Sequence, residues 1–346
     1  MGVPKLREII LEQRAEMEEI FQRERIVERE SKRTLTRFVK HPNILAVLGV
    51  RRCGKSILAF QIFSGEDFGY INFDDERLLG TKAEDLNRVL QVFYELYGKS
   101  LKNVVLDEPQ NVPGWELFVN RLRRTKRVVI TGSNSKLLAG ELATYLTGRY
   151  VDAELYPFSF QEFLKFHGIE PKGETTAERA ELIRHLKQYI SNGGFPEFFK
   201  FGKSILRRIY EDIVMKDVIK RYKIREVEGL RKIARFLVSN FSREFTYSAL
   251  REVSEARHLS TVSKWLGYLE EAYLLYKLER FSFKLKQSII APKKIYCVDT
   301  GLIESVGLKL SEDFGRLMEN VVALELFRRR GLPQGDFEVF YWKNHQ

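Results

Sequence analysis

The feature that most constrains the fold is a glycine-rich stretch, GVRRCGKS at residues 49–56, directly after the apolar run ILAVL. It matches the pattern G-x-x-x-x-G-K-[ST] at every position, and the residues that follow, KSILAFQIF, have helical spacing. A glycine-rich turn between a buried strand and a helix lets successive backbone N–H groups point at one anion, and the helix N-terminus adds partial positive charge. The stretch therefore predicts a phosphate-binding loop. A chance match would not explain the strand and helix on either side.

Residues 44 to about 165 alternate short apolar runs with stretches of helical spacing. The runs that indicate buried strands are ILAVLGV (44–50), GYINFDD (69–75), NVVLDE (103–108), RVVITGS (127–133) and YVDAELY (150–156). The helical stretches between them are KSILAFQIF, AEDLNRVLQVFYELYGK, WELFVNRLRR and SKLLAGELATYL. Regular strand–helix alternation specifies a parallel sheet with helices on both faces. We therefore predict an α/β fold around a five-stranded parallel sheet.

The loop supplies a set of candidate nucleotide-binding residues: Gly49, Val50, Arg51, Arg52, Cys53, Gly54, Lys55 and Ser56. Lys55 is placed to reach β- and γ-phosphate oxygens, and the Ser56 hydroxyl is a ligand for Mg²⁺. Cys53 occupies a variable loop position, where a cysteine needs no chemical role. Arg51 and Arg52 have two interpretations, as charges beside the nucleotide or as contacts to a neighbour.

An acidic pair follows the third predicted strand, in NVVLDEPQ. Ligands of parallel sheets bind at the carboxyl ends of the strands, so we expect Asp107 to help hold the magnesium opposite Ser56. The adjacent Glu108 is the candidate general base, because its carboxylate can orient and polarise an attacking water. Such a pair by itself is usually solvated surface. Its position downstream of a phosphate loop favours the hydrolytic interpretation.

Polar residues also end the fourth predicted strand, in VVITGSNS (128–135). We expect Ser133 or Asn134 to hydrogen-bond the γ-phosphate or the attacking water; the alternative is an ordinary turn that caps the next helix. Further along, LTGRY places Arg149 just before the fifth strand. Its guanidinium is a candidate to stabilise charge on the transferred phosphoryl group, from the same or a neighbouring subunit. An ordinary surface arginine is the alternative.

The second half carries most of the positive charge. Residues 203–294 hold 21 Lys and Arg against 11 Asp and Glu, a net charge of +10 out of +11 for the whole chain. From about residue 226, three short helical patterns (EGLRKIARFLVSNF, TYSALREVSEA and LSTVSKWLGYLEEAYLL) precede two strand-like runs, YKLERFSFKL and KKIYCVD. Three helices followed by a hairpin are typical of a winged helix. The charge favours a polyanionic partner, DNA or RNA first, and the winged-helix pattern favours duplex DNA. A solvated basic surface without a ligand is the alternative.

The third of these helices would be the recognition helix, with its first turns in the major groove. The residues expected to contact DNA there are His258, Ser260, Thr261, Ser263 and Lys264, while those expected to face the core are Leu259, Val262, Leu266, Leu269 and Leu274. Lys284 and Lys286, in FSFKLKQ, are expected in the wing, beside phosphates. The alternative is a winged helix that contacts proteins instead of DNA.

Five segments together resemble the archaeal and bacterial ATPases of the AAA+ superfamily that carry an uncharacterised C-terminal domain: GVRRCGKS, YINFDDERL, VVLDEPQNVPGWELFVNRL, VVITGSNSKLL and LTGRYVDAELYPFSFQEFL. The resemblance covers essentially the whole chain. It implies a P-loop ATPase core over 1–165, a helical lid over 166–225, a winged helix over 226–294, and a partial restriction-endonuclease-like α/β segment over 295–346. It also implies ATP and Mg²⁺ as cofactors, with the family's roles on Lys55, Ser56, Asp107, Glu108, Asn134 and Arg149.

The last segment carries only part of what a nuclease needs. The resemblance matches Glu319, in GRLMENVVALELFRRRG, to a helix glutamate that begins the family's final domain. The acidic-x-acidic-x-lysine stretch that holds the nuclease metal would follow VFYWKNHQ, where the sequence ends. A nuclease needs several carboxylates around Mg²⁺. We therefore expect a truncated or decayed domain and do not predict nuclease activity.

Several classes of protein are disfavoured. No apolar run approaches the roughly 18–20 residues of a membrane span, and the N-terminal pattern lacks the apolar region of a signal peptide. Cys53 and Cys297 are too few for a disulfide framework or a zinc site. We expect a cytoplasmic protein without membrane contact. Three functions stay open. The first is a Mg²⁺-dependent ATPase coupled to DNA binding, and the second is a slow nucleotide switch that controls protein assembly, including its own oligomers. The third is a metal-dependent nuclease or its remnant.

Overall fold

The computed structural model describes residues 2–40, 42–135, 146, 148–307, 313–333 and 335–343. The chain divides into two compact units. The first consists of Met1–Leu48 and Gly54–Leu155, and the second of Gly49–Cys53 and Tyr156–Gln346. The first residues of the glycine-rich loop therefore belong to the second unit, although the chain enters the loop from the first unit and returns to it.

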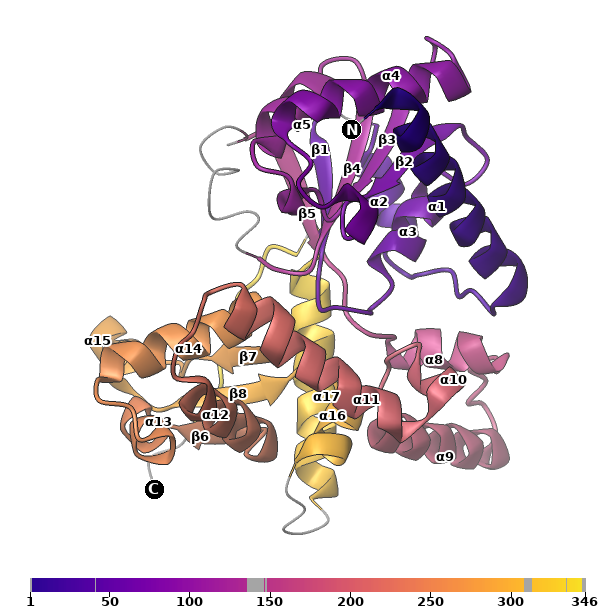
Figure 1. Ribbon diagram of the computed structural model, residues 1–346. Helices are drawn as coiled ribbons and strands as arrows, with labels where there is room; N and C mark the ends of the chain where they lie inside the picture. The colour runs from indigo at the N-terminus through magenta and orange to yellow at the C-terminus, as the bar shows by residue number, and fades with distance from the viewer. Residues whose placement is uncertain are drawn as a thin grey trace. The chain divides into compact units, whose positions relative to one another are not determined.

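A five-stranded parallel sheet forms the centre of the first unit (Figure 1). In the order β2-β3-β4-β1-β5, its strands are β2 (Phe68–Asn72), β3 (Asn103–Asp107), β4 (Arg127–Gly132), β1 (Ile44–Leu48) and β5 (Tyr150–Glu154). All four neighbouring pairs are parallel. The register pairs Leu48 with Gly132 and Asn72 with Asp107, so the carboxyl ends of these strands meet at one edge. The predicted α/β fold with a five-stranded parallel sheet is confirmed.

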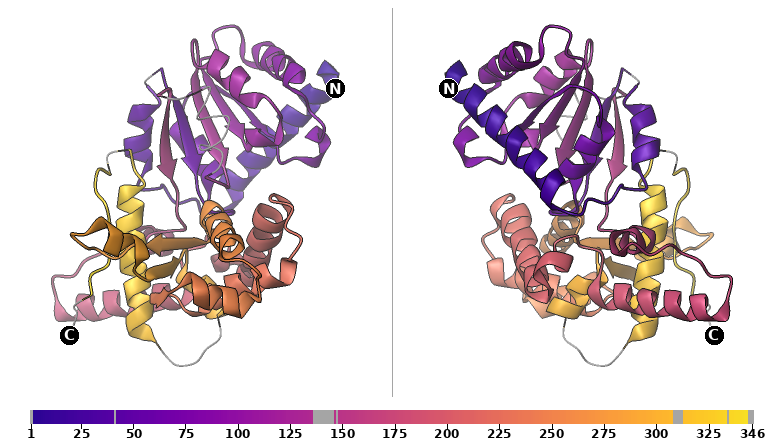
Figure 2. Two further views of the ribbon diagram at one scale, coloured as in Figure 1. Left: turned by 90° about the vertical axis from the view of Figure 1, so that its left-hand side faces the viewer. Right: turned by 90° about the vertical axis from the view of Figure 1, so that its right-hand side faces the viewer.

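Helices cover both faces of this sheet, as the two views of Figure 2 show. They are α1 (Val3–Arg23), α2 (Lys32–Phe38), α3 (Lys55–Ile62), α4 (Leu86–Tyr97) and α5 (Trp115–Leu122), with single turns η1 (Glu76–Leu78), η2 (Ala83–Asp85) and η3 (Pro109–Asn111). All residues of β1 and β3 are buried. Burial on both faces explains why these strands are continuous apolar runs instead of alternating ones. The helix expected over residues 135–146 lies almost entirely outside the described residues.

The N-terminal helix α1 is fastened to the edge strand β2. The Gln13 side chain, 3% exposed, donates to the Asn72 carbonyl at 3.0 Å and accepts the Asn72 N–H at 2.9 Å. It also donates to Asp75 Oδ2 at 2.8 Å. These bonds satisfy backbone groups that a strand at the edge of a sheet otherwise leaves unpaired.

The second unit begins with a helical region: α8 (Phe160–His167), α9 (Thr176–Asn192), α10 (Phe198–Phe201), α11 (Lys203–Asp212) and η4 (Ile213–Lys220). Its apolar centre is formed by Phe163, Leu164 and Tyr189. The segment η4 continues α11 as a π-helix. This helix form is rare in proteins and is frequently found at functional sites.

The next elements combine three helices with a small sheet: α12 (Val227–Ser239), β6 (Arg243–Phe245), α13 (Tyr247–Ser254), α14 (Leu259–Glu271), β7 (Leu275–Leu278) and β8 (Lys293–Cys297). The strands pair antiparallel in the order β6-β8-β7. The three helices and the antiparallel pair β7–β8 lie where the sequence predicts them. The short strand β6 is an addition, because three residues are too few to show alternation.

Two local expectations in this region are wrong. Leu259 is 43% exposed, because it is the first residue of α14 and precedes the turns that face the core. The stretch FSFKLKQ (281–287) does not extend β7; its last three residues begin the short helix α15 (Leu285–Ile290). The Ser282 hydroxyl accepts the Lys284 N–H at 3.2 Å and turns the chain, so Lys284 precedes this helix and Lys286 lies within it.

Two helices complete the described chain, α16 (Thr300–Val306) and α17 (Phe314–Arg330). The second of them confirms the predicted helix around Glu319. The described residues 336–343 form no strand, and Tyr341 makes an isolated bridge to Arg280.

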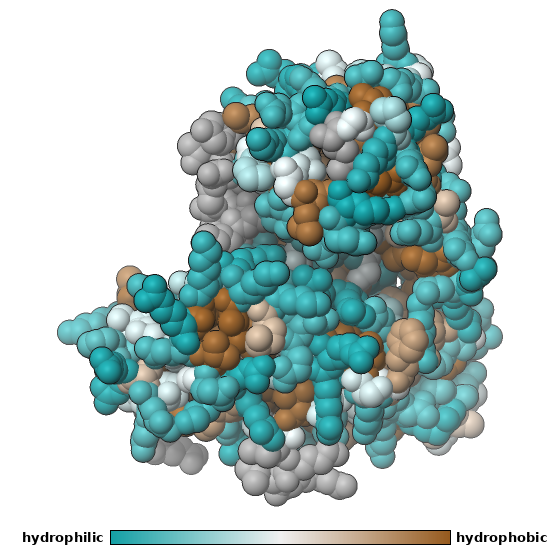
Figure 3. Space-filling view, in the orientation of Figure 1, coloured by the Kyte–Doolittle hydropathy of each residue, from teal (hydrophilic) through white to brown (hydrophobic). Residues whose placement is uncertain are grey.

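The face of the molecule drawn in Figure 3 is mostly hydrophilic, and its hydrophobic side chains form small scattered patches. None of the described helices combines the length and the apolar character that a bilayer crossing requires.

Candidate active site

The glycine-rich loop connects β1, which ends at Leu48, to α3, which begins at Lys55. Gly54 has a φ angle of 96°, a backbone conformation that residues with a side chain rarely adopt. The turn places Lys55 and Ser56 in the first turn of α3, where backbone N–H groups have no partner within the helix. Such a terminus suits an anion. The local conformation therefore agrees with the predicted phosphate loop.

Asp107 is the last residue of β3 and is 3% exposed. Its carboxylate accepts hydrogen bonds from the Tyr70 hydroxyl at 3.1 Å and from the hydroxyls of Ser56 and Thr131. Burial, and then the neighbouring Glu108, raise the pKa of Asp107 against the opposing effect of the Ser56 and Thr131 bonds. A cation beside this carboxylate would offset the cost of burying its charge. The adjacent oxygens of Ser56 and Asp107 are donors of the type that Mg²⁺ prefers.

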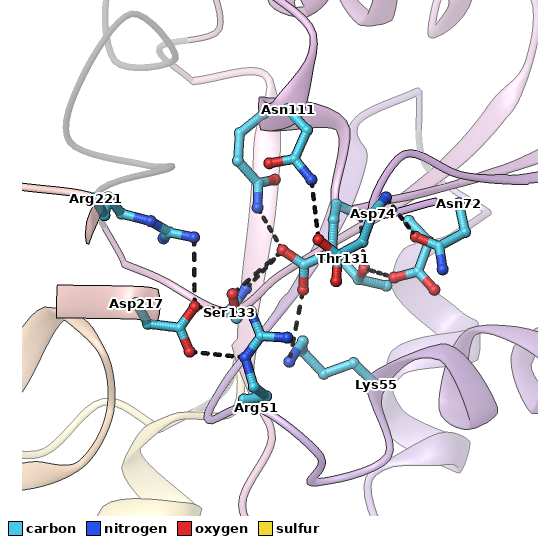
Figure 4. A network of polar contacts seen from close by, with 12 residues as sticks. Arg51, Lys55, Asn72, Asp74, Asn111, Thr131, Ser133, Asp217 and Arg221 are labelled. Carbon is cyan, nitrogen blue, oxygen red and sulfur yellow. Dashed lines mark hydrogen bonds and ion pairs between the residues drawn. The ribbon is translucent and has the colours of Figure 1, made fainter. Parts of the chain in front are cut away.

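Glu108 leaves the strand in a left-handed conformation with a φ of 49°. Its N–H donates to Thr131 Oγ1 at 3.2 Å, which holds the turn. Its carboxylate lies 3.9 Å from Lys55 Nζ and accepts the N–H and the hydroxyl of Ser133, both at 3.3 Å, as well as the Gln110 side chain. Figure 4 shows Lys55, Thr131 and Ser133, the three residues that contact Glu108 through these atoms. A strained non-glycine conformation of this kind is typical of functional sites.

The two neighbouring carboxylates differ in their access to water. The Glu108 side chain is 16% exposed, whereas Asp107 is almost completely buried. A buried carboxylate beside a hydroxyl suits a metal ligand, and a more accessible one beside an ammonium suits contact with water and phosphate. Chemically, the arrangement can bind a polyphosphate and activate a water molecule.

Arg51 and Arg52 contact acidic residues of the second unit, to which they themselves belong. Arg51 donates from Nε and Nη2 to the two oxygens of Asp217, at 3.0 and 2.9 Å. Arg52 Nη1 donates to Glu197 Oε2 at 2.6 Å. Both side chains therefore contact acidic residues that lie far along the same chain.

Sequence reasoning missed several residues around the loop and the acidic pair: Arg29, Tyr70, Gln110, Thr131 and Asp217. Arg29 is 4% exposed, and its Nη1 lies 3.4 Å from the position that a Cβ on Gly54 would take. Nothing in its local sequence, RIVERES, points to the loop. Thr131 did carry a signal, because it opens the polar end of the strand RVVITGS.

The two remaining candidate residues of the first unit, Asn134 and Arg149, lie at different ends of the sheet. Asn134 is 2% exposed in the turn after β4, and its neighbour Ser133 contacts Glu108. Arg149 precedes β5, whose first residue pairs with Ile44 at the start of β1. It therefore lies at the amino end of the sheet, opposite the phosphate loop, with Nη1 3.4 Å from Asn120 Oδ1. Within one chain Arg149 does not reach the loop.

The residues expected to contact DNA lie on exposed parts of the second unit. His258 holds the N-cap position of α14, and its first turns carry Ser260, Thr261, Ser263 and Lys264. Two of them border a surface pocket of about 220 Å³ whose full lining is Tyr222, Ile224, Arg225, Glu226, Thr261, Lys264, Trp265 and Tyr268. Lys284 and Lys286 are exposed around α15.

Glu319 of α17 is engaged by groups other than carboxylates. Its Oε1 lies 2.6 Å from Lys294 Nζ and accepts the Tyr296 hydroxyl at 2.8 Å. Across the described ranges of the chain, no three His, Cys, Asp or Glu side chains are grouped so as to hold a metal ion.

Comparisons with known proteins support the assignment of the first unit. Residues 41–164 match the family described as AAA domain, and residues 183–313 match a domain of unknown function (DUF8612). The uncharacterized protein MJ1544 of Methanocaldococcus jannaschii is 37% identical over 317 residues, which are 87% of this chain and 70% of that protein. An uncharacterized protein of Haemophilus influenzae is 32% identical over 308 residues, 83% of this chain and 74% of that protein.

The chain belongs to the family of these two proteins. Its AAA domain places it in the P-loop NTPase superfamily. Among solved structures, the Walker-type ATPase PABY2304 of Pyrococcus abyssi aligns with a TM-score of 0.51 at 15% identity, over 82% of this chain and 97% of that one. At this identity the likeness shows a shared fold.

Proposed function

We propose that this member of the family binds ATP with Mg²⁺ at the phosphate loop and hydrolyses it. The observation that carries the proposal is the convergence of Lys55, Ser56, Asp107 and Glu108 within one unit. The AAA domain over residues 41–164 supports it. The Ser56 hydroxyl and the Asp107 carboxylate would hold the Mg²⁺, which supplies positive charge to the phosphate oxygens when bound.

The residues of the chain divide the reaction between them. The loop backbone and the Lys55 ammonium bind the phosphate oxygens and stabilise the charge that develops on them. Glu108 orients a water molecule and takes its proton as the water oxygen bonds to the γ-phosphorus and ADP leaves. Ser133 fixes the Glu108 carboxylate through two hydrogen bonds, which limits the orientations that the base must search.

Replacement of Lys55 tests the binding site. Lys55→Ala should weaken the binding of a fluorescent ATP analogue at least tenfold, because a charge-assisted contact to phosphate is lost. Lys99→Ala, at an exposed lysine of the same unit, is the matched control and should bind as the wild type does. Equal affinities of wild type and Lys55→Ala would contradict the proposed site.

We propose further that α12–α14 and β6–β8 form a winged helix that contacts duplex DNA and couples to ATP turnover. The order of these elements and the exposed polar residues at the start of α14 support this proposal. So does the net charge of +10 over residues 203–294. The rival function is a nucleotide switch that acts through protein partners.

One assay separates the two functions. Duplex DNA should raise the steady-state ATPase rate if the winged helix couples DNA to turnover, and it should leave the rate unchanged in a protein-directed switch. The affinity for DNA should also fall steeply between low and moderate salt, because phosphate contacts release counterions. Binding that does not depend on salt would remove the electrostatic argument.

A further inference from the structure

Asp217 is a buried acidic residue that the proposed reaction does not use. It lies in the π-helical segment η4 and is 1% exposed. A carboxylate removed from water needs partners of opposite charge. Arg51 supplies two parallel hydrogen bonds, at 3.0 and 2.9 Å, and Arg221 Nη2 lies 3.6 Å away (Figure 4). A bidentate pair fixes the orientation of the guanidinium as well as its position.

The partner of Asp217 is a residue of the phosphate loop itself. The next loop residue, Arg52, has a φ of 66°, a left-handed conformation that costs free energy for any residue with a side chain. Its guanidinium contacts Glu197 at 2.6 Å and Asp212 at 3.7 Å. Two successive loop residues are therefore held by carboxylates that lie more than a hundred positions further along the chain.

We propose that Asp217 is a positioning residue for the phosphate loop: by holding Arg51, it keeps the loop backbone in the conformation that receives phosphate. This inference rests on the proposed ATP site. A loop that is already ordered loses little conformational freedom when a ligand binds, and this raises affinity. The segment η4, in which Asp217 lies, then presents this carboxylate to Arg51.

The direction in which the affinity for ATP changes when Asp217 is replaced distinguishes a positioning role from a purely electrostatic one. Asp217 is negative, so if only its charge mattered, its removal would strengthen the binding of a polyanion. If Asp217 positions the loop, its removal weakens binding even though the net charge becomes more positive. Asp217→Asn keeps the shape of the side chain and removes the charge, and is therefore the variant of choice.

The experiment measures the dissociation constant of a fluorescent ATP analogue together with KM and kcat of ATP hydrolysis. Asp217→Asn should raise the dissociation constant and KM by about tenfold, because charge-assisted hydrogen bonds that order the loop are lost. It should change kcat less than twofold, since Lys55, Asp107 and Glu108 are untouched. An unchanged or lower dissociation constant would overturn the proposal, and so would a loss confined to kcat.

A double-variant comparison shows whether the two residues act through each other. Arg51→Ala should have the same effect as Asp217→Asn, and the double variant should be no weaker than the weaker single variant. A double variant whose dissociation constant rises by the product of the two single-variant changes would contradict the proposal. Arg51→Ala also covers the case in which Asp217→Asn does not fold, because Asp217 keeps Arg221 as a partner in that variant.

The control is Glu211→Gln, which removes a carboxylate of α11 that pairs with Arg231 instead of the loop. This variant should bind ATP as the wild type does.

Failure of the proposed function gives a different result from failure of this inference. If the protein has no ATP site, the wild type and Lys55→Ala do not differ. If only the inference fails, the wild type binds ATP and Asp217→Asn binds it equally well.

Discussion

At the scale of single residues, the acidic pair depends on the hydroxyl of Thr131. This hydroxyl donates to Asp107 and accepts the N–H of Glu108 at 3.2 Å, so it serves both carboxylate residues at once. The motif that identifies the pair gives no information about this contact, because the register between β3 and β4 creates it. Tyr70, on the other side of Asp107, is brought there in the same way by β2.

Thr131→Val tests this arrangement, because it keeps the shape of the side chain and removes the hydroxyl. Turnover should fall about tenfold, since Asp107 and Glu108 each lose a hydrogen bond, and the free energy of unfolding should fall by about 1–3 kcal/mol. Steady-state kinetics and urea titration measure both effects. Thr131→Ser retains the hydroxyl and should behave as the wild type does; a fully active Thr131→Val variant would contradict this role.

Asp75 has a structural role in the segment YINFDDERL. It caps η1, and its carboxylate accepts bonds from Arg77 and from Gln13 of α1. The Arg77 side chain is the main reason why the pKa of Asp75 falls to about 2. Asp75 therefore joins the N-terminal helix to the end of β2.

The lowered pKa predicts a dependence of stability on pH. A carboxyl group of the unfolded chain titrates near pH 4, so the ionised Asp75 stabilises the folded protein above that pH, and this contribution is lost as the pH falls from about 4 to about 2. The free energy of unfolding of Asp75→Asn should therefore depend less steeply on pH in this range than that of the wild type. Urea titrations across the range measure it, with Asp74→Asn as the control for a lost negative charge. Parallel curves for wild type and Asp75→Asn would contradict the assignment.

At the scale of elements, the sequence predicts the helices and strands that carry a repeating apolar pattern. It does not predict features that depend on contacts between residues far apart in the chain. The strands β1 and β3 are readable because burial on both faces makes them continuous apolar runs. The elements β6 and α15 are too short for a strand or helix periodicity to be recognised. The π-helical form of η4 has no recognisable sequence pattern. Likewise, Lys55, Ser56, Asp107 and Glu108 follow from local motifs, whereas Arg29 and Asp217 reach the loop only through tertiary packing.

The packing of α12 against α14 is a contact that can be tested by adding one methyl group. A Cβ on Gly229 would stand 2.9 Å from the ring of Trp265 and 3.1 Å from the Ser254 carbonyl. Gly229→Ala should lower the free energy of unfolding by about 1–3 kcal/mol through overpacking. Gly267→Ala is the matched control, because nothing lies within 4 Å of its added Cβ and alanine favours a helix by about 1 kcal/mol. Equal stability of the two variants in chemical denaturation would contradict this packing.

At the scale of the whole molecule, Arg149 is the candidate to stabilise charge on the transferred phosphoryl group. This role requires more than one chain. It lies at the amino end of the sheet, so only a neighbouring subunit can bring it to a phosphate loop. The sequence places an arginine before the fifth strand but does not show which end of the sheet it occupies; the parallel pairing of β1 and β5 decides that. A role in a neighbouring site would make ATP turnover depend on assembly.

Mixing two inactive variants tests this role. Glu108→Gln and Arg149→Ala should each hydrolyse ATP slowly, and an equimolar mixture should regain activity, because some sites then combine an intact Glu108 with an Arg149 from the neighbour. Size-exclusion chromatography with ATP shows whether subunits associate. A mixture that is no more active than its components would exclude a role for Arg149 between subunits.

The most direct test of the proposed ATPase is the Glu108→Gln variant, assayed for both binding and turnover. We predict that it binds ATP within a few-fold of the wild type, because Lys55 and the loop are unchanged. Its turnover should fall by about 10²–10⁴-fold, the usual contribution of a general base. Turnover at the wild-type rate would contradict the assignment of Glu108 and, with it, the proposed mechanism.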